Sequence, residues 1–81
     1  MKYKVFHRIN GLSVEISNKA LATVLADYID IKCKGEVNVI EVIMSYPQKW
    51  AIIHLYCEND KYEIKDLEEV VEQFIIDKNI K

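Results

Sequence analysis

Residues 3–5 and 12–16 alternate between apolar and polar side chains, and they lie on either side of the dipeptide Asn10-Gly11. This dipeptide is favoured in two-residue type I′ turns, because both of its positions then take positive φ. The pattern therefore predicts a β-hairpin in which Val5 faces Ile16 and one side is apolar. The other side of the hairpin carries Lys4, Phe6, Arg8, Ser13 and Glu15.

Apolar residues recur at helical spacing in two later segments, and each segment has one apolar stripe. The first helix is expected to begin after an N-cap at Ser17 or Asn18 and to end at Gly35. The second is expected to begin at Asp66, with Glu69 completing a capping box. The two stripes consist of Leu21, Val24, Leu25, Tyr28 and Ile29 in the first helix, and of Leu67, Val70, Val71, Phe74 and Ile75 in the second.

Residues 37–58 form two strand-like runs on either side of a turn at Pro47, whose fixed φ suits the first corner of a turn. We expect Ser45 to face Trp50 across this turn. One side of the resulting hairpin is then almost wholly apolar. Its pairs are Met44 with Ala51, Val42 with Ile53, Ile40 with Leu55, and Asn38 with Cys57.

A further tight turn at Asn59-Asp60 predicts a short fifth strand that includes Tyr62 and Ile64. The element order is then strand, strand, helix, strand, strand, strand, helix (ββαβββα) in a single domain over residues 1–81. Two amphipathic helices and an antiparallel sheet of about five strands predict an α+β fold, a two-layer sandwich with both helices on one face. The alternative is a three-layer arrangement with one helix on each face.

In this register the reverse side of the sheet is too apolar to face water, and both helices are used on the other side. An exposed apolar patch on the order of several hundred Å² usually marks an interface, and Trp, Tyr and Arg often anchor interfaces. We therefore predict a protein interface on this side. Its residues are Phe6, Val39, Glu41, Ile43, Trp50, Ile52, His54 and Tyr56, with Val37 and Arg8 nearby.

The composition narrows the functional classes. The chain has 81 residues, of which 51% are hydrophobic and 30% charged, as is typical of a folded globular protein. Its apolar stretches are shorter than the roughly 18 residues of a membrane span, and the first residues lack the apolar core of a secretion signal, so we expect a cytoplasmic protein. Cys33 and Cys57 lack metal-ligand spacing and no cofactor motif occurs, so neither a metal nor a cofactor is expected.

The charge is distributed unevenly along the chain, although the net charge is only −2. Residues 1–35 hold six Lys or Arg and three acids, whereas residues 57–81 hold eight acids and four Lys. This uneven distribution of charge is compatible with head-to-tail association or with a basic partner. Ordinary charged residues on a solvent-exposed surface are the simpler explanation.

Three uses of the predicted interface compete. The first is binding of another protein or a second copy in a homodimer, as in a small non-enzymatic adaptor or inhibitor-like regulator. The second is single-stranded nucleic-acid binding, with bases stacked on aromatic rings and phosphates held by Lys4 and Arg8, although few cations lie nearby. The third is acid–base chemistry by Glu41 and His54, which the predicted register places opposite each other. A cross-strand ion pair is the simpler interpretation of that pair, so we favour protein binding and expect no catalysis.

Overall fold

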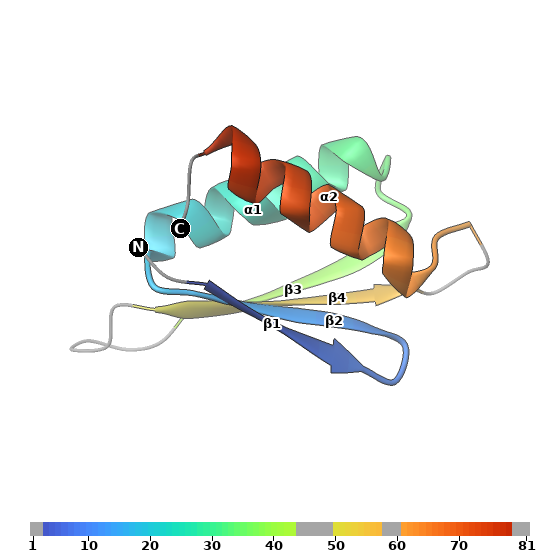
Figure 1. The fold of residues 1–81 in the computed structure, drawn as a ribbon, viewed down its shortest axis with the longest axis horizontal. Coiled ribbons are helices and arrows are strands. Elements are labelled where there is room, and N and C mark those ends of the chain that lie inside the picture. The colour runs from blue at the N-terminus through green and yellow to red at the C-terminus, as the bar shows by residue number, and fades with distance from the viewer. Residues whose placement is uncertain (1–2, 44–49, 58–60, 79–81) are drawn as a thin grey trace.

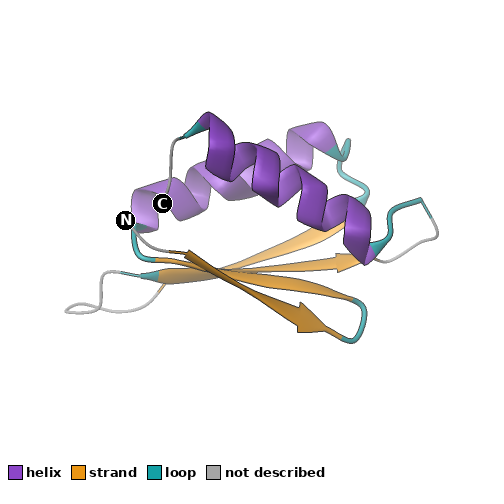
Figure 2. Ribbon diagram, viewed as in Figure 1, coloured by secondary structure: helices purple, strands orange, loops and turns teal. Residues whose placement is uncertain are grey.

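The computed structural model describes residues 3–43, 50–57 and 61–78. Within these residues, a four-stranded antiparallel sheet of order β1-β2-β4-β3 lies against two helices. Both helices lie on one side of the sheet, and no described helix or strand lies on the other (Figure 1, Figure 2). The elements are β1 (Tyr3–Arg8), β2 (Gly11–Ile16), α1 (Lys19–Lys32), β3 (Val37–Ile43), β4 (Ala51–Cys57) and α2 (Ile64–Asp77).

The predicted α+β class, with an antiparallel sheet and two helices, is confirmed, but the predicted fifth strand is wrong. Ile64, expected in that strand, is the first residue of α2. The backbone N–H of Glu63 donates to Oδ2 of Asp66 at 2.9 Å, so the helix is capped three residues before the predicted capping box. The predicted turn at residues 59–60 lies outside the described residues. The element order in the described chain is therefore ββαββα.

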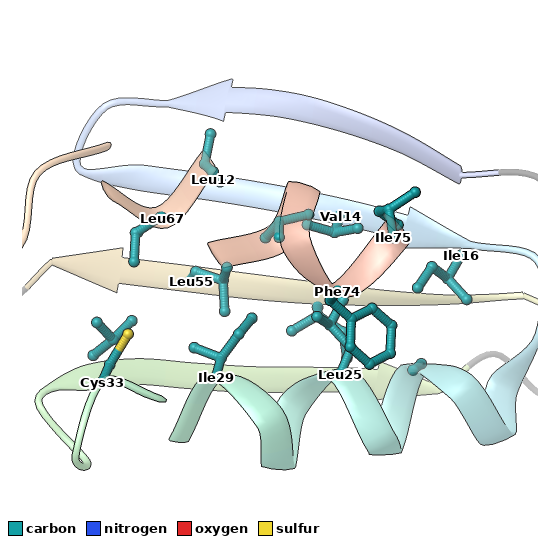
Figure 3. Close-up of a cluster of buried hydrophobic side chains, with 14 of the residues drawn as sticks. Leu12, Val14, Ile16, Leu25, Ile29, Cys33, Leu55, Leu67, Phe74 and Ile75 are labelled. Atoms are coloured by element: carbon teal, nitrogen blue, oxygen red, sulfur yellow. The ribbon is translucent and has the colours of Figure 1, made fainter. Parts of the chain in front are cut away.

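An apolar cluster fills the space between the sheet and the helices (Figure 3). Leu25 and Ile29 of α1 reach it from one helix, and Phe74 of α2 reaches it from the other, with its ring centroid 5.3 Å from that of Tyr28. Full burial of a side chain of this size contributes about 1.5–3 kcal/mol. The central strands supply every second residue to the cluster, all fully buried: Leu12, Val14 and Ile16 from β2, and Ala51, Ile53 and Leu55 from β4.

Both ends of α1 lie where the sequence predicts. Asn18 is the N-cap, and its Oδ1 accepts a hydrogen bond from the backbone N–H of Leu21 at 3.2 Å. At the other end, Lys34 and Gly35 take φ values of 54° and 73°, the left-handed conformation that closes many helices. The N–H of Gly35 donates to the carbonyl of Asp30 at 2.9 Å. The chain reverses here, and β3 packs against α1.

The hairpin of β1 and β2 forms as expected, but its predicted register is wrong by two residues. Val5 pairs with Val14 instead of Ile16, and the two loop residues are Ile9 and Asn10. A shift by an even number of residues leaves each side chain on its predicted face. The apolar side of the hairpin therefore still points toward the helices.

Gly11 is required by a close approach of two backbones and not by a positive φ. Of the described glycines, only Gly35 has a positive φ. A Cβ atom added at Gly11 would lie 1.7 Å from the carbonyl oxygen of Leu55 on the neighbouring strand. Strand β4 therefore passes too close to position 11 for any side chain. Because Gly11 pairs with Arg8 as the first residue of β2, Asn10 and Gly11 do not form the predicted two-residue turn.

The predicted register of β3 and β4 is wrong by one residue. Val39 pairs with Leu55 and Ile40 pairs with His54, where the sequence pattern predicts Ile40 opposite Leu55. A shift by an odd number moves every side chain of a strand to the other face. Apolar residues occupy both alternations of β3, so the pattern does not distinguish the two registers. The connection that sets the register, residues 44–49, lies outside the described residues.

Candidate functional site

The side of the sheet away from the helices is named the open face, and the side against the helices the covered face (Figure 1). The strand register arranges the open face in three rows that cross the strands in the order β1, β2, β4, β3. These rows are Arg8, Gly11, Tyr56, Asn38; then Phe6, Ser13, His54, Ile40; and then Lys4, Glu15, Ile52, Val42.

Large apolar side chains of the open face are exposed to solvent. Phe6, Ile40 and Val42 are 42%, 43% and 38% exposed. Ile52 is half-buried and pairs with Val42, so the β3–β4 half of the open face carries a continuous apolar strip. Phe6 stands at the opposite edge of the sheet, on β1. Exposed apolar surface of this kind, at both edges of one sheet face, is typical of an interaction site.

A chain of polar side chains runs through the middle of the open face. Nε of Arg8 donates to Oγ of Ser13 at 2.9 Å, and this oxygen lies 2.7 Å from Nδ1 of His54. Ser13 is fully buried, so water does not satisfy its hydroxyl group. A hydroxyl oxygen has one hydrogen and two lone pairs, so Oγ accepts from Arg8 and still forms its hydrogen bond with Nδ1 of His54. These two hydrogen bonds hold the side chains of Arg8 and His54 in place.

The aromatic rings of β4 lie next to this chain. The rings of His54 and Tyr56 are stacked, with centroids 6.2 Å apart and an interplanar angle of 28°. Tyr56 pairs with Gly11, where no side chain competes for the space above the sheet. At the other end of the face, Trp50 helps to line a cavity of about 210 Å³. The other lining residues are Tyr3, Lys4, Glu15 and Ser17.

The structure brings together some of the predicted interface residues and separates others. Phe6, Ile52, His54 and Tyr56 share the open face, and Trp50 directly precedes β4 at its end. The one-residue register shift places Val39 and Glu41 on the covered side of β3, as partners of Leu55 and Ile53, and pairs the backbone of Ile43 with Ala51. Ile40 and Val42, which the predicted register turns toward the helices, take their places on the open face.

The predicted pairing of Glu41 with His54 is wrong for the same reason. Glu41 lies across the sheet from His54, and its Oε2 accepts a hydrogen bond from Oγ1 of Thr23 on α1 at 3.2 Å. Glu41 therefore cannot act together with His54 as the acid–base pair that the predicted register suggested. Sequence reasoning missed the Ser13–His54 contact, although the hairpin parity already placed Ser13 on this face. Since Ser13 has no exposed surface, a substrate cannot approach its Oγ as it would a nucleophile.

A second hollow of about 450 Å³ lies beside the two helices. At its rim, Nζ of Lys61 contacts Oε1 of Glu36 at 2.7 Å, and this hydrogen bond raises the pKa of Lys61. Both partners are substantially exposed, so the ion pair contributes little to stability. The hollow is lined by Tyr28, Lys32, Lys61, Tyr62, Asp66, Glu69, Val70 and Gln73.

The two cysteines lie near the covered face as free thiols. Burial raises the pKa of Cys33, and the neighbouring Cys57 raises it further. Burial also raises the pKa of Cys57. Thiols of this kind react slowly at neutral pH. Within residues 3–43, 50–57 and 61–78, no three acidic, His or Cys side chains gather as metal ligands, and neither helix is long and apolar enough to span a bilayer.

Comparison with known protein families, with curated proteins and with solved structures finds no match to this chain.

Proposed function

We propose that this chain is a small, non-enzymatic protein-binding module whose open face binds a partner protein, as in an adaptor or an inhibitor-like regulator. One observation carries the proposal: both helices pack on the covered face, which leaves Phe6, Ile40 and Val42 exposed on the other (Figure 1). Burying such side chains in a complex releases water from apolar surface, which is the main driving force of protein association.

The bonded chain in the middle of the open face supports specific recognition. Arg8 is held by Ser13, so little side-chain entropy is lost when a partner contacts its guanidinium group. His54 is held through Nδ1 and is half-buried, which leaves Nε2 in a fixed position for a hydrogen bond with a partner. Arg and Tyr are among the residues that most often dominate binding energy. Interfaces usually have an apolar core and a polar rim, so the polar centre of the open face would select the partner through fixed hydrogen-bonding groups, while the apolar residues on either side supply the buried area.

The cytoplasm is the compartment that this proposal assumes. Cys33 and Cys57 are free thiols, and thiols persist in the reducing cytoplasm. The proposal requires no metal and no cofactor.

Single-stranded nucleic acid is the second candidate partner, and the register favours it in one respect. With Glu41 on the covered side, Lys4 and Arg8 outnumber Glu15 among the charged residues of the open face. Nucleic-acid binders that use a sheet face combine such cations with stacked rings. Two cations give a weak electrostatic contribution, and Arg8 is already engaged by Ser13, so we favour a protein partner.

The experiment compares the wild-type chain with a double variant of the open face, Phe6→Ser and Ile40→Ser. A matched control is Val24→Ser with Ile31→Ser on α1, whose side chains are 41% and 76% exposed. Partners captured from cells by the wild type are identified and purified, and their affinities are measured by calorimetry. The open-face variant is expected to lose about 100-fold or more in affinity, and the control less than about 3-fold.

Circular dichroism verifies that each variant is folded, so that lost binding is assigned to the surface. An open-face variant that binds as well as the wild type would contradict the proposal. Titration of a fluorescent oligothymidylate separates the second candidate. Tight binding at low salt that weakens steeply as salt is added would assign the face to nucleic acid instead.

A further inference from the structure

The two edge strands of the sheet differ in how well they resist pairing with another chain. β1 carries Lys4 and Arg8, and charged side chains on an edge discourage further strand addition. β3 has the sequence VNVIEVI, with Glu41 as its single charge, and among the described strands it pairs with β4 alone. A long edge rich in β-branched residues is a template for another strand.

We propose that two copies of this chain pair through β3, in antiparallel orientation about Ile40, to form a symmetric dimer with one continuous sheet. In this register Ile40 faces its own copy and Val39 faces the partner's Glu41. Because the two-fold axis passes through the middle of Val37–Ile43, all seven residues of the strand take part. Moving the axis to Glu41 would place two carboxylates opposite each other, which is unfavourable.

Helix α1 is placed to extend this contact. The hydrogen bond from Thr23 to Glu41 sets the middle of α1 above the middle of β3, while Tyr28 points to Phe74 on the other side of the helix. A two-fold axis beside β3 brings the two α1 helices side by side and antiparallel. Strands lie about 4.8 Å apart, so helices that each sit above β3 and β4 come to about 10 Å, the usual packing distance.

The facing side of α1 is complementary to itself. At 100° per residue, Lys19, Thr23, Ala26 and Asp30 fall within a sector of about 60° on the helix. Along the helix axis, the small residues Thr23 and Ala26 lie between Lys19 and Asp30, where the two helices come closest. Lys19 and Asp30 lie near the two ends of α1, so an antiparallel partner brings each Lys19 near the other copy's Asp30. The dimer thereby gains two equivalent ion pairs in addition to strand pairing.

The dimer also extends the open face, because the two copies of Ile40 meet across the junction, and each Val42 lies diagonally across from the other copy's Ile40. The dimer forms through the edge strand β3 and through α1, so its formation does not require another protein to bind the open face.

The test is sedimentation equilibrium of the full chain at concentrations from about 1 µM to 1 mM. The wild type is expected to be a dimer in the upper part of this range. Ile40→Lys, which places like charges at the two-fold axis, is expected to raise the dimer dissociation constant about 100-fold. A strict monomer at the highest wild-type concentration would overturn the proposal.

Charge exchange on α1 tests the register without touching the sheet. Asp30→Lys and Lys19→Asp should each raise the dissociation constant about 5-fold or more at low salt, and combining them should restore it to within about 2-fold. Each change puts a favourable charge at its helix end, so neither variant is expected to unfold. Asp77→Lys on α2 is the control and should change nothing. A dimer that is insensitive to both single α1 variants would rule out this arrangement.

The two proposals give different patterns. Phe6→Ser should weaken partner binding and leave the dimer intact, because Phe6 lies on β1 at the far edge of the sheet. The α1 charge variants should weaken the dimer and leave each open face able to bind its partner. Loss of one property without the other therefore identifies which proposal has failed.

Discussion

Phe74 and Phe6 are the only phenylalanines of the chain, and they lie on opposite sides of one sheet. Phe74 is fully buried between α2 and the covered face, whereas Phe6 is 42% exposed on the open face. The covered face is held by close packing of aliphatic side chains against two helices (Figure 3). The open face is ordered by hydrogen bonds among Arg8, Ser13 and His54. The same strands thus support a core on one side and an ordered but uncovered surface on the other.

This difference explains how a small sheet can expose apolar residues on one face and still hold the side chains of that face in fixed positions. Close packing of aliphatic side chains needs contacts from a second layer, which α1 and α2 provide on the covered face. On the open face, where no described helix or strand lies, directional hydrogen bonds within the sheet fix the side chains of Arg8 and His54. Substitutions on the two faces should therefore act on different properties, stability on the covered face and binding on the open one.

Exchange of each phenylalanine for alanine gives the largest expected contrast. Phe74→Ala removes a fully buried ring and should lower the free energy of unfolding by about 3–5 kcal/mol. Phe6→Ala is its matched control and should lower it by less than about 1 kcal/mol. Urea denaturation followed by circular dichroism measures both. Equal losses would mean that the open face is packed as tightly as the covered one.

The two glycines give the next contrast, because only one of them lies where the strands cross closely. Gly11→Ala would put a Cβ atom 1.7 Å from the Leu55 oxygen and should cost about 2–4 kcal/mol, since the β2 and β4 backbones must separate. Gly35→Ala meets no atom within 4 Å, and its φ of 73° alone should cost about 1 kcal/mol. Thermal unfolding compares the two. A smaller loss at Gly11 than at Gly35 would restore the turn interpretation of Asn10-Gly11.

Much of the covered face could be predicted from sequence, because its elements are strongly patterned. The predicted stripe of α2 is buried at Leu67, Val71, Phe74 and Ile75. The first hairpin keeps its predicted faces despite a two-residue error in register. Side chains of a strand alternate with a period of two, so a register error of two residues does not change which side chains are predicted to be buried. In α1, Val24 belongs to the predicted stripe but is 41% exposed. The buried side of this helix runs through Ala22, Leu25 and Ile29 toward Cys33 at the C-cap, and Val24 lies outside it.

The open face could be predicted only in part, because β3 has apolar residues on both alternations. Ile40 and Val42 are as apolar as Val37 and Val39, and only pairing with β4 decides which set faces the helices. The polar chain of Arg8, Ser13 and His54 joins β1, β2 and β4, and no local pattern indicates contacts between such distant positions. The start of α2 was missed because Glu63 and Asp66 form a capping box in the reverse of its usual residue order.

Removal of the buried hydroxyl tests how far hydrogen bonds order the open face. Ser13→Ala leaves Nε of Arg8 and Nδ1 of His54 without their shared partner and should lower stability by about 1–3 kcal/mol. The His54 nitrogen resonances should also change, because Nδ1 loses its hydrogen bond with Ser13. Arg8→Met, alone and together with Ser13→Ala, completes a double-mutant cycle. Strictly additive losses would contradict coupling between Arg8 and Ser13.

The smallest expected effect concerns the thiols of the covered face and depends on pH. Burial raises the pKa of Cys33 above its ordinary value of 9.0. As pH rises through that value, the unfolded chain loses the thiol proton first, while the folded chain keeps it. The folded state then binds more protons, so stability falls as pH rises above about 9.

Other groups also titrate at high pH, so the prediction concerns a difference between two chains. Cys33→Ala should be less stable than the wild type at pH 8, and the gap should narrow by pH 10, because only the wild type loses the thiol contribution. Urea unfolding at both pH values measures the gap. A gap that widens with pH would mean that the thiolate is the favoured form in the folded chain, and the covered face would then not be sealed from water at its Cys33 end.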